Sequence, residues 1–287
     1  MVNRRVPLRP EAPQGPVYAY PEHLRYCLET LPRLPGVYIF HGESETLPLY
    51  IGKSVNIRSR VMSHFRTQQE ASLLQQTRRI SWHETAGELG ALLLEARLIK
   101  EQQPLFNKRL RRNRQLCSLR LQGSKPEVVY AREVDFSHTQ DLFGLFANRR
   151  TALEALKTVA DTQRLCYGIM GLEPLSRGRA CFRSMLNRCA GACCGRESIE
   201  EHNARLRSAL AHLQLVCWPW KGAVALEEQR DSLTHYHIIN NWLWLGAVES
   251  LAEAETLTRI STGFDQDGYK ILCRPMLSGS YTIHPLE

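Results

Sequence analysis

The sequence predicts an α/β protein. It begins with a small module, a three-stranded antiparallel sheet flanked by helices, and continues with a cysteine-rich α+β region and a small β-rich C-terminal region. Three observations predict this order. Residues 36–40 and 48–52 are rich in β-branched and aromatic side chains and are separated by a polar stretch, as in a β-hairpin with a long loop. Helix, strand and helix patterns follow the hairpin. Four of the nine cysteines then cluster in the middle of the chain.

Composition narrows the class of protein further. With 287 residues, of which 43% are hydrophobic, the chain can bury at least one full core in one to three domains. Its formal net charge of +8 favours polyanionic partners. No run approaches the roughly 18 apolar residues of a membrane span. The basic, proline-rich N-terminus lacks the apolar segment of a secretory signal, and the odd cysteine count argues against a disulfide framework. We therefore expect a reducing cytoplasm.

The first hairpin places its side chains alternately on two faces. Val37 and Ile39 share one face of the first strand, and Tyr38 lies on the other. In the second strand, Ile51 and Tyr50 likewise point in opposite directions. If the apolar sets face one core, both tyrosines line a polar surface.

The remaining elements follow from capping and periodicity. Ser54 or Asn56 can cap a helix that runs to about residue 65, on which Arg60 and His64 share a face. A strand at 79–83 leads to an apolar helix at about 87–103. Beyond it we expect strands at 118–122, 127–131 and 143–147, helices at 151–164 and 199–215, and short strand-like pieces in the last 70 or so residues. Residues 265–268 read as a turn and residues 235–237 as strand, rather than as calcium or metal sites.

Two segments, Leu34-Pro-Gly-Val-Tyr38 and Leu49-Tyr-Ile-Gly-Lys-Ser54, resemble the signature of the GIY-YIG nucleases, with Val37 where isoleucine is commoner. Arg60, His64, Glu95 and Asn107 follow in the order of that family. An ordinary cross-strand pair of aromatics is the alternative for two tyrosines alone. Six ordered positions favour the nuclease.

The resemblance implies roles for these residues. Tyr38 would orient or deprotonate the attacking water, which requires a cation to lower its pKa, and Lys53 is the nearest one in sequence. Tyr50 would hydrogen-bond the water or phosphate. Arg60 would bind phosphate oxygens through two hydrogen bonds. His64 would act on a proton, or would be a bystander on its helix face.

Glu95 is the acid inside the apolar sequence Leu92-Leu-Leu-Glu-Ala-Arg-Leu-Ile99, where a carboxylate needs a compensating partner. Mg²⁺ (or Mn²⁺) held by this one carboxylate, waters and substrate phosphate would be such a partner. A salt bridge to Arg97 or to a neighbouring strand is the alternative. Asn107 would tie substrate or strand in place, or would be a turn residue after the helix.

Several cationic side chains are candidates for DNA contact. The run after the long helix either contacts phosphates or forms a solvated linker; its members are Lys108, Arg109, Arg111, Arg112 and Arg114. A second group surrounds the cysteines and suggests another DNA-backbone surface: Arg177, Arg179, Arg183 and Arg188.

Within the GIY-YIG group, the segments Ala91-Leu-Leu-Leu-Glu95 and Pro104-Leu-Phe-Asn107 look like the N-terminal half of the repair nuclease UvrC, and so do the order and spacing of the cysteines. For Cys166, Cys181, Cys189 and Cys193 the family implies a [4Fe-4S] cluster. Zn²⁺ and unliganded buried thiols are the alternatives.

The UvrC resemblance implies a monomeric endonuclease of nucleotide excision repair. It would cut 3′ of a bulky lesion in damaged double-stranded DNA, on UvrB that UvrA has loaded, as part of a damage-induced response. An autonomous GIY-YIG nuclease and a non-catalytic DNA- or UvrB-binding adaptor are the alternatives. We expect an N-terminal arm at 1–30, the nuclease domain at 31–110, a linker and cysteine-rich region at 111–215, and a region of unknown role at 216–287.

Overall fold

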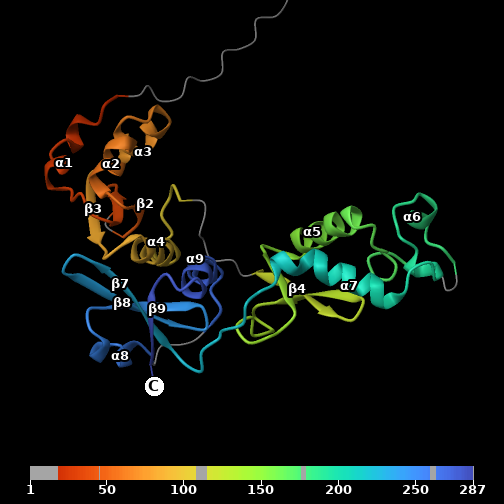
Figure 1. Cartoon of the computed structure of the whole chain (residues 1–287). Helices are drawn as coiled ribbons and strands as arrows, with labels where there is room; N and C mark the ends of the chain where they lie inside the picture. Colours follow the sequence, from red (N-terminus) through yellow and green to blue (C-terminus); the bar gives the residue numbers. More distant parts are fainter. Residues whose placement is uncertain (1–18, 45, 108–114, 176–178, 259–262, 287) are drawn as a thin grey trace, which may run out of the picture. The chain divides into compact units, whose positions relative to one another are not determined.

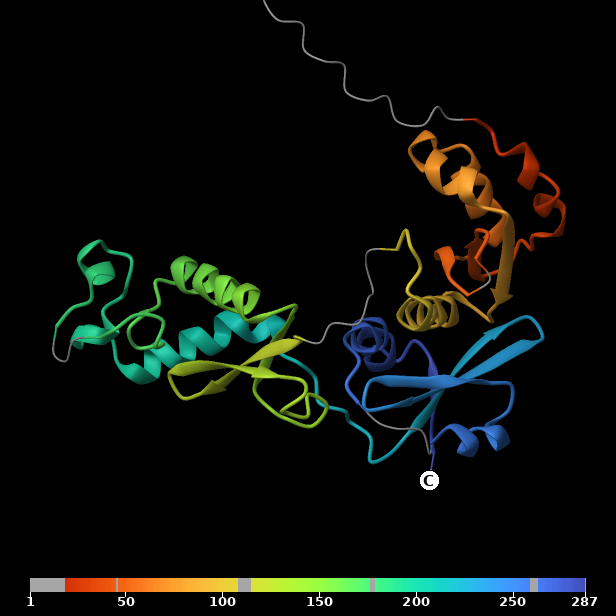
Figure 2. The ribbon, with the colours of Figure 1, turned by 180° about the vertical axis from the view of Figure 1, so that it is seen from behind.

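A computed structural model describes residues 19–44, 46–107, 115–175, 179–258 and 263–286 (Figures 1 and 2). The chain divides into two compact units. The first comprises Met1–Arg111 together with Glu228–His235, and the second comprises Arg112–Glu227 together with Tyr236–Glu287.

The first unit contains the predicted three-stranded antiparallel sheet, in the order β2-β1-β3. Its elements are η1 (Glu22–Leu24), α1 (Cys27–Thr30), β1 (Gly36–His41), β2 (Pro48–Ser54), α2 (Ile57–Phe65), η2 (Gln68–Glu70), α3 (Ala71–Gln76), β3 (Arg79–Glu84) and α4 (Glu88–Gln102). Asn56 caps α2 as predicted, its side chain accepting a hydrogen bond from the Ser59 N–H at 2.9 Å. The short helices η2 and α3 were not predicted, because they are too brief to show a helical period.

Both faces of this sheet are covered. On one face, Val37 and Ile39 pack against Ile99 of α4. On the other, Tyr38 lies in a core with Phe65 of α2 and is only 1% exposed. The expectation that the tyrosine face is a polar surface was therefore wrong for Tyr38, because the hairpin alone does not reveal that helices close over it.

Residues that the sequence assigned to an N-terminal arm contribute to this core. Leu24 and Cys27, from η1 and α1, are 0% and 4% exposed and pack with Phe65 and its neighbours. The ring of Tyr20 also meets Phe65 edge-on, with centroids 6.1 Å apart. The described part of this segment thus packs on the nuclease module.

A distant carboxylate holds the start of α4. The N-cap, Gly87, has no side chain with which to satisfy the first N–H groups of the helix. Instead, Glu228 accepts hydrogen bonds from the N–H groups of Leu89 at 2.9 Å and Gly90 at 3.0 Å. Glu228 is 5% exposed and lies in the 228–235 segment of the first unit. Its negative charge also suits the positive end of the helix dipole.

The second unit contains a three-stranded sheet in the order β5-β4-β6. It also contains most of a four-stranded sheet in the order β10-β7-β8-β9, of which residues 228–235 belong to the first unit. The elements are β4 (Cys117–Gln122), β5 (Lys125–Tyr130), β6 (Leu142–Phe146), α5 (Arg149–Thr162), α6 (Phe182–Met185), η3 (Ala192–Cys194), α7 (Ile199–Leu210), η4 (Ala211–Leu213), β7 (Val224–Arg230), β8 (Leu233–Asn240), β9 (Leu243–Val248), η5 (Leu251–Glu253), α8 (Glu255–Thr258), α9 (Gln266–Leu277) and β10 (Thr282–Pro285).

The three-stranded sheet packs against α5 and α7, with Phe143, Leu156 and Leu206 fully buried between them. His237 lies in β8, as predicted. Asp265, predicted to lie in a turn, caps α9 by accepting from the N–H groups of Asp267 and Gly268. Among the described residues, no helix is both long and apolar enough to cross a bilayer.

We predict that Glu228→Gln destabilises the start of α4. The amide offers one oxygen where two are used and removes the charge at the helix N-terminus, so the free energy of unfolding should fall by about 1–3 kcal/mol. Urea unfolding of the whole chain measures this loss. Gln229→Ala, an exposed neighbour on the same strand, is the control and should change stability by less than about 0.5 kcal/mol. Equal stability of the two variants would contradict the proposed cap.

Candidate active site and cysteine cluster

Tyr38, His64 and Glu70 form a chain of hydrogen bonds in the first unit. The Tyr38 hydroxyl lies 2.6 Å from His64 Nε2, and His64 Nδ1 pairs with a carboxylate oxygen of Glu70. Strand β1 supplies the tyrosine, the second half of α2 supplies the histidine, and η2 supplies the glutamate. His64 is 2% exposed and Tyr38 is 1% exposed, so Glu70, whose side chain is 32% exposed, is the accessible member of this chain.

The charge states of this chain follow from its surroundings. An ionised Glu70 can only accept a hydrogen bond, so a neutral His64 carries its proton on Nδ1 and accepts the Tyr38 hydroxyl at Nε2. Burial lowers the pKa of His64 below 6.5, although Glu70 opposes this shift. Burial raises the pKa of Tyr38 well above 10, Tyr50 adds to the shift, and Arg60 opposes it. Both rings are therefore neutral at pH 7.

Glu95, Arg60 and Tyr50 interact electrostatically with one another and with Tyr38. Burial raises the pKa of Glu95, while the Lys53 backbone N–H, the Lys53 charge and Arg60 lower it. Burial and the Glu95 charge raise the pKa of Tyr50. Arg60 is exposed on α2, so its guanidinium is available to a phosphate. The sheet and two helices thus bring one carboxylate, one guanidinium and two phenols close enough to shift one another's pKa values.

Lys53 does not act as the sequence suggested. Its ammonium lies 2.5 Å from the Glu88 carboxylate, and the cation that lowers the Tyr38 pKa is Arg60. The Lys53 backbone N–H instead donates to Glu95 Oε1 at 3.0 Å. This contact joins Glu95 to β2 by a backbone hydrogen bond, whereas the alternative from the sequence was a salt bridge. Arg97 lies only two positions along α4 from Glu95, so the two side chains do not face each other.

Asn107 and Gly52 shape the strand that carries Tyr50. The Asn107 side chain accepts from the Ile51 N–H at 2.9 Å and donates to the Ile51 carbonyl at 2.8 Å, which ties the end of the module to β2. A Cβ on Gly52 would lie 2.6 Å from Tyr38 Cζ and 2.8 Å from a carbon of the Tyr50 ring. Glycine is therefore required here by the two tyrosine rings, in addition to any approach of substrate.

The four predicted cysteines come together in the second unit. The sulfur atoms of Cys166, Cys181, Cys189 and Cys193 all lie within 4.8 Å of one another. Cys194 is outside this group, and its thiol contacts the Gly191 carbonyl. Burial raises the pKa of Cys166 to about 11. A bound cation would compensate for thiolates in so buried a place, so the donor set fits a metal centre.

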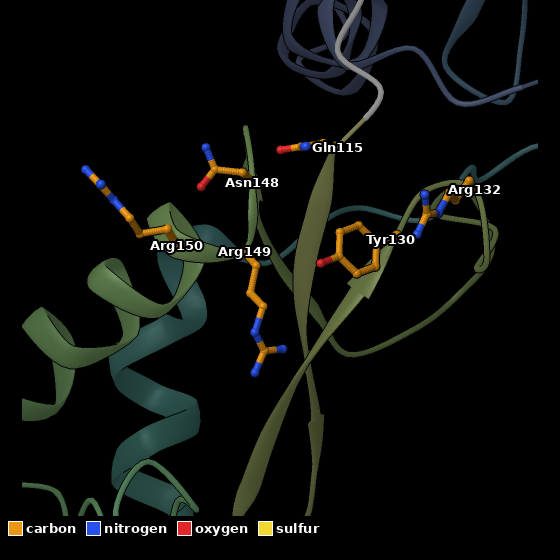
Figure 3. A pocket seen from close by; sticks show the side chains of 6 residues that line it. All are labelled: Gln115, Tyr130, Arg132, Asn148, Arg149 and Arg150. Carbon is orange, nitrogen blue, oxygen red and sulfur yellow. The ribbon is translucent and has the colours of Figure 1, made fainter.

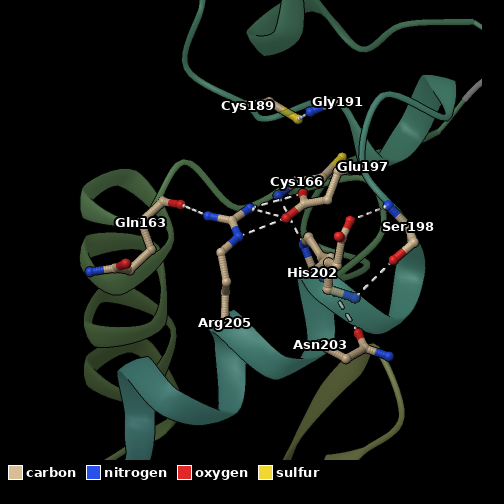
Figure 4. Close-up of polar contacts among 10 residues, drawn as sticks. Gln163, Cys166, Cys189, Gly191, Glu197, Ser198, His202, Asn203 and Arg205 are labelled. Carbon is tan, nitrogen blue, oxygen red and sulfur yellow. Dashed lines mark hydrogen bonds and ion pairs between the residues drawn. The ribbon is translucent and has the colours of Figure 1, made fainter.

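Polar contacts from α7 hold the loop that carries these thiols (Figure 4). His202 is fully buried, and its Nε2 accepts from the Cys166 N–H at 3.0 Å. Arg205 pairs with both carboxylate oxygens of Glu197, at 2.6 and 2.9 Å, and also donates to the Gln163 carbonyl. These contacts fix the Cys166 backbone to α7 and tie Glu197, which follows the last of the four cysteines, to the same helix.

The arginines around the cysteines differ in how accessible they are. Arg183 pairs with Asp161 and lies over the Tyr167 ring at 3.8 Å, with a side chain only 15% exposed. It therefore braces the fold, and the expectation that it faces DNA was wrong. Arg179 and Arg188 are exposed. Other cations predicted to contact DNA lie outside the described residues: Lys108, Arg109, Arg111, Arg112, Arg114 and Arg177.

Three family models match the chain in succession. The UvrC-like GIY-YIG domain matches residues 34–108, the UvrC/Cho excinuclease middle domain matches residues 116–212, and the excinuclease Cho C-terminal domain matches residues 223–287. An excinuclease Cho of Escherichia coli K12 is 69% identical over 287 residues, covering 100% of this chain and 97% of the relative.

The chain belongs to the excinuclease Cho family. It is a GIY-YIG endonuclease that acts on DNA, of the UvrC-like type found in nucleotide excision repair. The excinuclease Cho of Salmonella typhi is 68% identical over 100% of this chain and 98% of the relative. The UvrABC system protein C of Methanosarcina mazei is 32% identical over 65% of this chain and 35% of that relative. The Cho-family match thus confirms the UvrC resemblance.

Among solved structures, the chain matches GIY-YIG N-terminal endonuclease domains of UvrC from Thermotoga maritima. One has magnesium as its catalytic divalent cation; it is 31% identical over 30% of this chain and 97% of that chain, with a TM-score of 0.28. A point mutant of the same domain is 30% identical over 31% of this chain and 98% of that chain, with a TM-score of 0.29.

Sequence reasoning missed one residue of the hydrogen-bonded chain in this Cho-family nuclease. Glu70 lies six positions after His64, in a short 3-10 turn that no periodicity marks. A carboxylate shortly after a buried histidine was the available signal, but many exposed acids share it.

We predict that Glu70→Gln lowers kcat about 10²-fold or more, because His64 loses the partner that fixes its tautomer and stabilises its protonated form. KM for DNA should change little. Removing the Glu70 charge also lowers the His64 pKa further, so the acid limb of the pH–rate profile should move to lower pH. Gln69→Ala, exposed on the same turn, is the control. An acid limb that stays in place would assign it to Glu95, whose pKa is raised, and would exclude His64 as the proton acceptor.

Proposed function

We propose that this Cho-family nuclease hydrolyses a phosphodiester 3′ of a bulky lesion in damaged double-stranded DNA, in a complex with UvrB that UvrA has loaded. The observation that supports catalysis most directly is the Tyr38–His64–Glu70 chain beside Glu95 and Arg60. Membership of an excinuclease family supports the repair context. We further propose that the chain acts as a monomer in the cytoplasm, in a damage-induced response.

The proposed proton path begins at the attacking water. Because the Tyr38 pKa is far above 7, a free phenolate is not the base. Tyr38 instead takes a proton from the water while its own proton passes to His64 Nε2, and the Glu70 carboxylate stabilises the resulting imidazolium. The hydroxide forms the new bond to phosphorus as the bond to the leaving oxygen breaks, and the leaving alkoxide takes up a proton from solvent water.

Other side chains would hold the phosphate. The exposed Arg60 would donate to non-bridging oxygens, where negative charge builds up. Tyr50 would orient the water or phosphate, and Lys53 would add positive charge beside β2. Glu95 would bind Mg²⁺ (or Mn²⁺), since one half-buried carboxylate with waters and phosphate oxygens meets the ion's preference for oxygen ligands. When bound, the ion supplies Lewis-acid stabilisation of the phosphate charge.

We further propose a [4Fe-4S] cluster at the four clustered cysteines, as the UvrC resemblance implies, with Zn²⁺ as the alternative. Four thiolates satisfy either centre. A single tetrahedral ion with bonds of about 2.3 Å also suits sulfurs that lie close together. The basic residues 108–114, together with Arg179 and Arg188, would contact the DNA backbone.

The test of the nuclease role uses an end-labelled, lesion-bearing duplex preloaded with UvrA and UvrB in Mg²⁺. We predict one nick 3′ of the lesion, reduced about 10²- to 10³-fold in Glu95→Gln. Glu101→Gln, exposed on the same helix, is the matched control and should cut normally. Cutting of undamaged DNA without UvrB would favour an autonomous nuclease instead. Loss of cutting in both variants would contradict the special role of Glu95.

The test of the metal centre is the composition of anaerobically purified protein. We predict iron and acid-labile sulfide with visible absorbance, lost in Cys181→Ser. Cys194→Ser, which removes the adjacent thiol outside the group, should keep both. Zinc without iron or colour would show that the site holds a single tetrahedral Zn²⁺ ion and no cluster. Protein without either metal would show that the thiols are unliganded and buried.

A further inference from the structure

A basic pocket opens in the second unit, and none of its lining residues belongs to the catalytic set or to the four-cysteine group. Its volume is about 380 Å³, and its lining contains three arginines, a tyrosine and two amides but no carboxylate: Gln115, Tyr130, Arg132, Asn148, Arg149 and Arg150. The side chains come from the start of α5, the end of β5 and the segment just before β4 (Figure 3).

We propose that this pocket binds a phosphate of the DNA backbone. The inference deepens the proposed function, on which it rests, by placing a DNA contact in the middle domain. A guanidinium presents a planar pair of donors that matches phosphate oxygens, and three of them around one hollow are suited to a phosphodiester. The lining has no acidic side chain; Arg132 and Arg150 pair with exposed carboxylates outside it, and Arg149 is the arginine whose charge a bound anion would match.

The position of Arg149 strengthens this argument. Arg149 and Arg150 are the first two residues of α5, where cations are disfavoured by the positive end of the helix dipole. Arg150 pairs with the exposed Glu154 on the same helix at 3.1 Å, and an exposed pair of this kind contributes little. Within the described residues, Arg149 pairs with no carboxylate. An anion in the pocket would offset this unfavourable arrangement.

The other lining groups suit a nucleic-acid strand. The Arg132 guanidinium lies 5.1 Å from the centre of the Tyr130 ring, and it also pairs with its exposed neighbour Glu133. In Figure 3 the Tyr130 hydroxyl and the Arg149 side chain approach the same space between α5 and β5. Asn148 uses its side-chain oxygen to cap α5, accepting from Thr151 N–H at 3.0 Å, which leaves its amino group as a donor. Donors and an aromatic edge thus surround one open hollow.

The choice between a DNA phosphate and a free phosphate follows from exposure. All three arginines are exposed, so the pocket is open to an extended strand. A site built for a small free anion usually surrounds it, because buried donors interact more strongly.

The test compares Arg149→Gln with Lys157→Gln in full-length protein that also carries Glu95→Gln, so that the labelled duplex is not cut. Lys157 is exposed on the same helix, outside the pocket, and its substitution removes the same charge. Fluorescence anisotropy across a salt series gives the affinity and its salt slope. We expect Arg149→Gln to weaken binding several-fold and to reduce the slope by about 0.9, the value for one phosphate contact. Lys157→Gln should leave the slope unchanged.

Equal effects of the two substitutions would show that only net charge matters, and no effect of either would show that Arg149 makes no phosphate contact; both results would overturn the pocket. Thermal stabilisation of the protein by inorganic phosphate that Arg149→Gln abolishes, with unchanged duplex binding, would overturn the DNA assignment in favour of a free anion. Incision is scored separately, in protein with Glu95 intact. A chain that binds through Arg149 but does not nick the UvrB-loaded duplex would contradict the proposed function and leave the pocket standing.

Discussion

The hydrogen bond between the Tyr38 hydroxyl and His64 Nε2 is the contact on which the candidate active site depends. It exists because α2 closes over the tyrosine face of the sheet and buries both rings. Burial keeps both groups neutral, and the Glu70 carboxylate selects the histidine tautomer that can accept a proton from tyrosine. In the proposed mechanism, this core contact is the route by which a proton leaves the attacking water.

Helix α4 carries the other half of the site and is held at both ends. Glu228 satisfies the N–H groups at its start, and Asn107 beyond its end clamps β2 through two hydrogen bonds. Glu95 lies between these supports and accepts from the Lys53 backbone. The carboxylate is therefore fixed relative to the strand that bears Tyr50, which is the condition for a preorganised electrostatic site.

The second unit uses its charged residues in two different ways. Around the four thiols, Arg183 and Arg205 are occupied by carboxylates and stabilise the loop and α7. At the start of α5, by contrast, Arg149 lines an open pocket that contains no carboxylate. Sequence alone cannot separate the two classes, because a guanidinium engaged by Asp161 and one facing solvent look alike in a basic protein.

The sequence by itself determined the order of the three strands and two longer helices of the first module, the side-chain alternation of β1 and β2, a helix cap at Ser54 or Asn56, and which four cysteines are grouped. These features depend on local periodicity and motif spacing. Only the tertiary structure revealed that both sheet faces are covered, that Glu70 meets His64, and that Glu228 reaches the start of α4. Such contacts depend on how separate elements pack, and the Glu228–Gly90 bond joins residues 138 positions apart. No local pattern records which buried donor a distant carboxylate will satisfy.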